Sequence, residues 1–184
     1  MPPPTTEPVY VVSLLEILWG GILIAITMAL HGCGMVGVLR VNGALASRFK
    51  PAGTLARSLS ILIATSWLIV MVHLVEVLVW AGFFYWRDAV NPNTSGSANT
   101  SLCYYFALLD YTCLGSNYNL RQNWRLLEGM ISMTGLLTFA WSTGVLMTLA
   151  QEFQDQQMQR IKKRREKAAS GHHHAPHGKP GAAD

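Results

Sequence analysis

Residues 102–150 read LCYYFALLDYTCLGSNYNLRQNW followed by RLLEGMISMTGLLTFAWSTGVLMTLA. The first apolar segment, about ten residues long, is too short to cross a bilayer, whereas the second is long enough at about 1.5 Å per residue. A turn holding Gly115, Ser116 and Asn117 separates them. Irregular backbone at membrane depth is tolerated only where it is buried in protein or lines a water-filled cavity. The stretch therefore predicts a re-entrant half-helix, a loop shielded from lipid and a full inner helix, which is the plan of a pore module.

The motifs YTCLGSNYNL, NWRLLEGM and GLLTFAWSTGVL resemble the pore loop and inner helix of small bacterial potassium-channel-like proteins of the two-pore-helix ion-channel superfamily. That family reads roughly Y-T-T-L-G-Y-G-D before W-R-L-L-x-x-x-E. The residues that stand where this pattern puts them are Tyr111, Thr112, Leu114, Gly115, Trp124, Arg125, Leu126, Leu127 and Trp141. Cys113 replaces the filter threonine and Ser116 the aromatic residue, while Asn117 replaces the second glycine and Tyr118 the acid. The resemblance implies a cation pore formed by a homo-tetramer.

The composition indicates an integral membrane protein. Of the 184 residues, 51% are hydrophobic and 13% charged, the formal net charge is +4, and the apolar residues fall in blocks. The first apolar stretch has no basic n-region and a long apolar run, so we expect a retained span rather than a signal peptide. Cys103 and Cys113 would lie ~15 Å apart by helical rise, beyond disulfide reach.

The predicted fold is all-α, with three transmembrane helices, a re-entrant pore helix with its filter loop, a cytoplasmic C-terminal helix and a disordered tail. The expected parts are an extracytoplasmic cap (1–8), two transmembrane helices joined by a basic loop (9–101, with spans at about 9–39 and 59–86), the pore segment (102–150) and the cytoplasmic helix with a His-rich tail (151–184). Most of the 14 Lys and Arg residues lie in the first connecting loop or beyond residue 150. By the positive-inside rule that side, including the C-terminus, is cytoplasmic, and the N-terminus and filter entrance face outward.

The loop is the candidate selectivity filter. Backbone carbonyls arranged in rings from several copies can replace the water around an ion. Successive carbonyls point the same way only if alternate residues adopt unusual dihedrals, and Gly115 and Asn117 are spaced for this. Without an aromatic residue at position 116 we expect a wider mouth and weaker potassium selectivity. The candidate filter and pore residues are Asp110, Thr112, Cys113, Leu114, Gly115, Ser116 and Asn117.

Asp110 lies near the C-terminal, negative end of the predicted pore helix. Two roles remain open for its carboxylate. Beside a cation path it would raise the local cation concentration. Alternatively it braces the loop through a hydrogen bond to a neighbouring tyrosine or tryptophan.

Ionisable residues in the predicted spans form a second candidate site. His73 and Glu76 lie three residues apart and therefore share a helix face, and such residues at membrane depth are a functional hypothesis by default. If Glu128 converges with them, the group is a hydrogen-bonded anchor for the filter, a proton-sensitive gate or a metal site. We favour the hydrogen-bonded network without a metal, and expect His31 to be isolated from it. Gly135 and Gly144 are candidate hinges of the inner helix, with close packing as the alternative.

Residues 151–167 have a helical composition and favour a continuation of the inner helix into a cytoplasmic bundle, or a basic patch drawn to lipid. From residue 170 on the composition predicts disorder, and His172, His173, His174 and His177 would bind a transition metal only weakly. No nucleophile–base–acid arrangement, phosphate loop or CxxC pair is present, so we expect no enzymatic activity.

The predicted function is that of an ion-channel subunit in the cell membrane, passing monovalent or divalent cations among membrane lipids, with no cofactor and no nucleic-acid partner. The first alternative is a channel-derived scaffold or accessory subunit that does not conduct. The second is a metal or proton transporter that uses the His and Glu residues of the spans.

Overall fold

The computed structural model describes residues 12–48, 55–92 and 97–172. Within them the chain is all-α apart from one short β pairing, as the sequence predicts. The helices are α1 (Leu14–Arg48), α2 (Leu55–Trp86), α3 (Thr100–Tyr111) and α4 (Leu126–His172), with strands β1 (Val90–Asn91) and β2 (Asn119–Leu120) and the 3-10 turn η1 (Gln122–Trp124). The expected cap at 1–8 and the tail beyond residue 172 lie outside the described residues, as does part of the first connecting loop.

Three helical segments are long and apolar enough to cross a membrane, judged by length and composition: Leu14–Leu45, Leu59–Trp86 and Gln122–Lys167. This agrees with the predicted number of long apolar helices and suggests a multi-pass membrane protein. The first helix differs from the prediction in its limits, because it begins at Leu14 and continues to Arg48 rather than ending near residue 39. The apolar part of α1 itself extends to Leu45, beyond the predicted end of the span.

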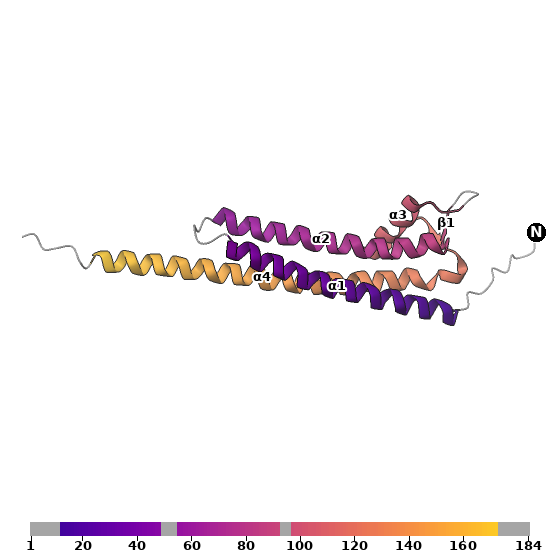
Figure 1. Ribbon diagram of the computed structural model, residues 1–184, viewed down its shortest axis with the longest axis horizontal. Coiled ribbons are helices and arrows are strands. Elements are labelled where there is room, and N and C mark those ends of the chain that lie inside the picture. The colour runs from indigo at the N-terminus through magenta and orange to yellow at the C-terminus, as the bar shows by residue number, and fades with distance from the viewer. Residues whose placement is uncertain (1–11, 49–54, 93–96, 173–184) are drawn as a thin grey trace, which may run out of the picture. The chain divides into compact units, whose positions relative to one another are not determined.

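The chain divides into two compact units, Met1–Gly144 and Val145–Asp184. In the first unit α1 and α2 run antiparallel and side by side (Figure 1). Gly34 permits their close approach, since a Cβ atom there would lie 2.7 Å from Cγ1 of Val72. The second unit contains the remainder of α4, whose side chains up to residue 167 are mostly exposed.

α3 runs back along α2 from the end of that helix. Near its start, the Ala98 amide donates to Oδ1 of Asp88 over 3.2 Å, just beyond the end of α2. At its last residue, the Tyr111 hydroxyl donates to Oε2 of Glu76. Glu76 precedes the end of α2 by ten residues, which corresponds to about 15 Å along the helix axis. α3 therefore penetrates well into the helical bundle.

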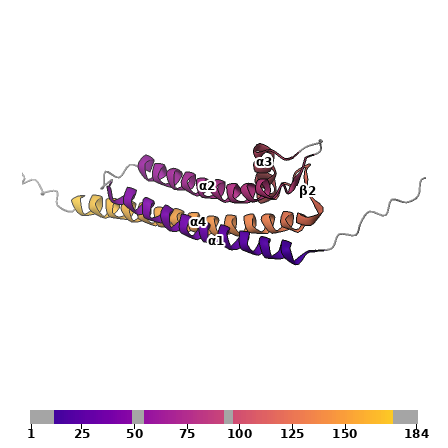
Figure 2. The same cartoon turned by 45° about the vertical axis from the view of Figure 1, so that its right-hand side comes forward.

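The segment after α3 returns to the end of α2 where α3 began. β2 pairs with β1 through Leu120 and Val90, and the Arg121 amide donates to the Ala89 carbonyl over 2.8 Å. α3 and both strands accordingly lie at the same end of α2 in both ribbon views (Figures 1 and 2). Residues 98–121 thus enter the bundle and leave it at the same end, after which α4 begins.

Local capping defines both ends of α3. The Asn99 side chain accepts from the Leu102 amide over 2.7 Å, which is the N-cap expected of asparagine. At the other end the Leu114 amide donates to the Leu109 carbonyl and the Cys113 amide to that of Asp110, so the helix ends in a Schellman motif. Cys113 occupies its left-handed position, with φ 59°, where glycine is usual.

The apolar core of the first unit lies where α2, α3 and α4 meet. Its largest fully buried side chains include Trp80, Phe84, Phe106, Leu127 and Ile131. Phe84 and Phe106 meet edge to face with ring centroids 5.4 Å apart. This core holds α3 against the two long helices and thereby fixes the position of its C-terminal end.

Candidate functional site

A cluster of buried polar side chains lies in the first unit, at the inner end of α3. We call it the polar cluster. Four helices contribute to it: His31 from α1, His73 and Glu76 from α2, Tyr111 from α3, and Thr138 and Ser142 from α4. All six are buried, with at most 7% of the surface of any one exposed.

Glu76 is the only acid in the polar cluster and is bonded from three sides. Nδ1 of His31 lies 2.8 Å from its Oε1. The Tyr111 hydroxyl donates to Oε2, and Nδ1 of His73 lies 3.3 Å from the same oxygen. The Tyr111 oxygen also lies 2.5 Å from Oγ1 of Thr138. Side chains of α1, α2 and α3 therefore all contact this buried carboxylate, which meets the requirement that buried polar groups be hydrogen-bonded.

The two histidines turn their other ring nitrogens toward one hydroxyl. Oγ of Ser142 lies 3.0 Å from Nε2 of His73 and 3.4 Å from Nε2 of His31. Aromatic rings cover the imidazoles, with Phe139 at 4.5 Å from the ring centroid of His73 and Trp141 at 5.3 Å from that of His31. Both imidazoles are thus oriented by contacts on both nitrogens.

The prediction for His31 was wrong, because it is bonded to Glu76 rather than isolated. The predicted third member, Glu128, lies apart from the polar cluster: its Oε1 accepts from the Leu120 amide over 2.7 Å. A signal for the α4 members is present in the sequence. Thr134, Thr138 and Ser142 recur every four residues and share one buried helix face.

The candidate filter residues form a tight loop after α3. Oγ1 of Thr112 donates to the Leu108 carbonyl over 2.9 Å, and Oγ of Ser116 donates to that of Tyr118 over 2.8 Å. Cys113, Leu114, Gly115 and Asn117 are exposed, Leu114 by 76%.

The dihedrals of this loop correct one expectation. Positive φ occurs at Cys113 (59°) and Gly115 (73°), and Asn117 is not among the described residues with positive φ. The alternation therefore begins two residues earlier than the predicted pair. The reason is the Schellman ending of α3, which requires a left-handed residue at position 113.

Asp110 is buried at the end of α3, with 7% of its surface exposed. Burial, followed by the charge of Glu128, raises the pKa of this carboxyl to about 7. The tyrosine or tryptophan bond proposed for its side chain is not found among the described residues, whereas its backbone carbonyl accepts from Oγ of Ser132 over 2.8 Å. The α4 contact at this position is therefore made by the Asp110 main chain.

The two glycines of α4 differ in their surroundings. A Cβ atom on Gly135 would overlap the Tyr111 carbonyl oxygen, so this glycine lets the end of α3 lie directly against α4. A Cβ atom on Gly144 would meet nothing within 4 Å. Gly144 is also the last residue of the first unit. Close packing accounts for Gly135, and the predicted hinge role of either residue stays a prediction.

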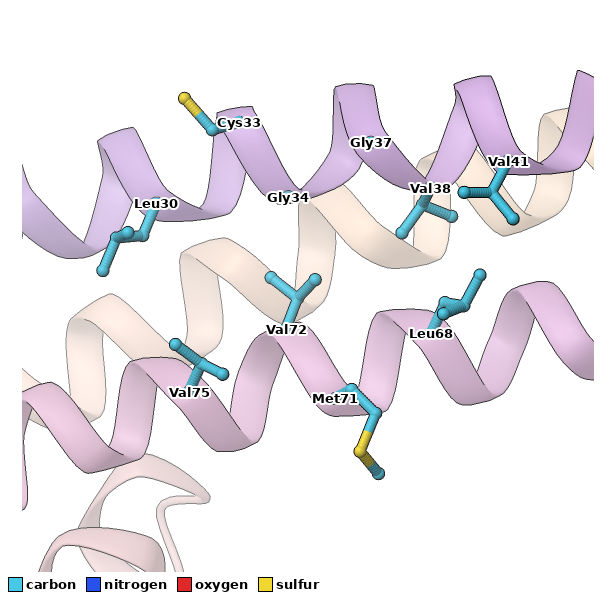
Figure 3. A pocket seen from close by; sticks show the side chains of 10 residues that line it. All are labelled: Leu30, Cys33, Gly34, Gly37, Val38, Val41, Leu68, Met71, Val72 and Val75. Carbon is cyan, nitrogen blue, oxygen red and sulfur yellow. The ribbon is translucent and has the colours of Figure 1, made fainter.

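A separate apolar groove of about 510 Å³ lies between α1 and α2 (Figure 3). In the close-up Val72 points toward Gly34, while the Cys33 side chain points away from α2. The lining residues are all Leu, Val, Met, Gly or Cys, so the groove offers no charged group to a ligand.

Comparisons with protein-family models, with curated proteins and with solved structures find no match for this chain. The fold and site therefore define a class only: an all-α protein with three candidate membrane spans. The likeness to potassium-channel-like proteins rests on the residues named above.

Proposed function

We propose that this chain is a subunit of a cation channel in a cell membrane, with α3 as its pore helix, residues 112–117 as its filter and a homo-tetramer as its assembly. The observation that carries the proposal is the path of residues 98–121. α3 has 12 residues and is about 18 Å long, whereas a hydrocarbon core is about 30 Å thick. A segment whose helix enters the bundle and whose following loop returns to the same end is suited to a re-entrant path through a membrane.

The backbone of the loop supports a row of carbonyl ligands. Left-handed dihedrals at Cys113 and Gly115 alternate with ordinary ones, and such alternation turns successive carbonyls toward one side. Rings of carbonyls from several chains would then replace the hydration shell of a cation. One chain supplies one loop, so a ring requires assembly, and the tetramer follows from the family resemblance.

The charges near the loop favour cations. The C-terminal end of α3 carries the negative end of the helix dipole and adjoins the filter. Asp110 adds a buried carboxyl at this end of α3. Tyr111, the next residue, is bonded to Glu76, and the polar cluster in this way fixes the base of the filter.

A thiol-block experiment tests the proposal without altering the fold. Purified protein in liposomes should pass potassium, sodium or a divalent ion, and a methanethiosulfonate reagent should block that flux by modifying Cys113, which is exposed in the loop. Cys113→Ser should conduct and resist the reagent. Cys33→Ser is the matched control, because Cys33 is also exposed but lies on α1; it should remain sensitive.

Asp110→Asn and Gly115→Trp extend the same assay. Asp110→Asn should change the conductance or the ranking of ions while the oligomer persists, and Gly115→Trp should abolish flux. Absence of flux for every ion, from protein shown to be folded and oligomeric, would contradict the channel and support the scaffold alternative. Flux that survives Gly115→Trp but is lost in His73→Ala and Glu76→Gln would identify a transporter instead.

A further inference from the structure

We propose that the polar cluster is a binding site for one transition-metal ion of the zinc class, with His31, His73 and Glu76 as its protein ligands. One ligand atom from each of these residues lies within 4.8 Å of the other two. Imidazole nitrogen and carboxylate oxygen are ligands that Zn²⁺ prefers, and two histidines with one glutamate form a known zinc-ligand set. The site does not depend on conduction and would exist equally in a chain that does not conduct.

The surroundings of the ligands match what a bound metal requires. Both Nδ1 atoms lie on the side of Glu76, and both Nε2 atoms lie within 3.4 Å of Oγ of Ser142. Histidines that bind a metal through one nitrogen donate the other N–H to an acceptor, which fixes the ring. A hydroxyl oxygen has two lone pairs and can accept both bonds. Tyr111 meanwhile holds the second carboxylate oxygen.

If Glu76 is ionised and both imidazoles are neutral, the contacts of the polar cluster require one proton more than its groups supply. Tyr111 has a single hydroxyl proton, which goes to Glu76, so His73 must donate from Nδ1 to the Tyr111 oxygen. His31 must likewise donate from Nδ1 to Glu76, because a carboxylate has no proton to give. If both imidazoles are neutral, their Nε2 atoms carry no proton, and the single proton of Ser142 cannot serve both. Both Nε2 atoms then compete for the one Ser142 proton.

A divalent ion satisfies these contacts, and a proton that makes one imidazole cationic is the alternative that the test below distinguishes. Bound to the two Nδ1 atoms and to Glu76, the ion moves the ring protons to Nε2, and both N–H groups can then donate to Ser142. It also offsets the carboxylate charge inside the bundle. The ion would join α1 to α2 and, through the bond of Glu76 to Tyr111, the end of α3. Metal binding would accordingly stabilise the arrangement of these three helices.

The test must exclude the histidines near the C-terminus. The chain has six histidines, and replacing His172, His173, His174 and His177 by alanine leaves His31 and His73 as its only two. This full-length variant, purified in detergent and stripped with EDTA, should take up about one Zn²⁺ per chain on reloading, by elemental analysis. Its melting temperature should rise with Zn²⁺ and not with Mg²⁺, which prefers oxygen ligands.

Further substitutions in the same variant locate the ion. His73→Gln and Glu76→Gln should abolish Zn²⁺ uptake, and Ser142→Ala should weaken it roughly 10- to 100-fold, because Ser142 positions the ligands without binding the ion. Cys33→Ser is the control, since Cys33 lies two residues from His31 on an exposed face of α1. It should leave uptake unchanged.

Loss of Zn²⁺ uptake could also result from unfolding, so a further variant is tested for a new spectroscopic signal. His31→Cys loaded with Co²⁺ should show a thiolate-to-cobalt charge-transfer band that the parent protein lacks. The proposal is overturned if the folded protein takes up no Zn²⁺, if uptake persists in His73→Gln and Glu76→Gln, or if His31→Cys gives no such band while remaining folded. A melting temperature that follows pH but ignores Zn²⁺ would overturn it too, and would indicate a protonated imidazole instead.

Discussion

The Tyr111 side chain bonds α3 to both α2 and α4. Its hydroxyl contacts Glu76, His73 and Thr138. Tyr111→Phe leaves the buried Glu76 carboxylate short of a donor, and we expect the free energy of unfolding to fall by about 1–3 kcal/mol. Thermal unfolding in detergent measures this as a lower melting temperature.

Tyr105→Phe is the matched control, because Tyr105 lies on the same helix but is 49% exposed. Its effect should stay within about 0.5 kcal/mol, as for most surface substitutions. Equal losses in the two variants would mean that the Tyr111 hydroxyl does not stabilise the protein through its buried bonds.

Residue spacing predicts partners only within one helix. It placed His73 beside Glu76, because residues three apart share a face. It did not place His31 there, since that contact depends on the register between α1 and α2, and 45 positions separate His31 from Glu76. The hydroxyls of α4 follow a readable spacing of four, yet their partners are fixed only when the helices pack.

At the level of elements, the contact between α3 and α4 depends on one missing side chain. Gly135→Ala would push a Cβ atom into the Tyr111 carbonyl, which is backbone and cannot rotate away. We expect the free energy of unfolding to fall by about 1–3 kcal/mol, the usual cost of overpacking. Chemical denaturation in detergent, followed by tryptophan fluorescence, checks this.

Gly129→Ala, also in α4, provides the comparison, because a Cβ atom there meets nothing within 4 Å. Alanine favours helix over glycine by about 1 kcal/mol, so this variant should be neutral or more stable. If Gly135→Ala proved as stable as Gly129→Ala, the close approach of α3 to α4 would be refuted.

Length and composition predicted the long helices and the short α3, because these depend on apolar runs that are continuous in sequence. The backbone dihedrals of the candidate filter loop were harder to predict. Glycine signals a left-handed position at 115, but the sequence gives no such signal at Cys113, where the helix ending imposes it. An element's end is therefore harder to predict than its existence.

For the whole molecule, the sequence predicts orientation through charge. Basic residues gather in the first connecting loop and beyond residue 150. Because cytoplasmic loops carry an excess of Lys and Arg, the end of the molecule that holds the start of α3 should face outward.

Cysteine labelling in intact cells tests this orientation. In a background carrying Cys33→Ser and Cys113→Ser, with the buried Cys103 retained, single cysteines are placed at the exposed positions Ser97 and Lys163. A membrane-impermeant maleimide should label Ser97→Cys in intact cells, because Ser97 precedes α3, and should label Lys163→Cys only after lysis. Labelling of Lys163→Cys from outside would invert the topology. It would place the candidate filter loop nearer the cytoplasmic side, and the charge bias of this chain would then not govern its insertion.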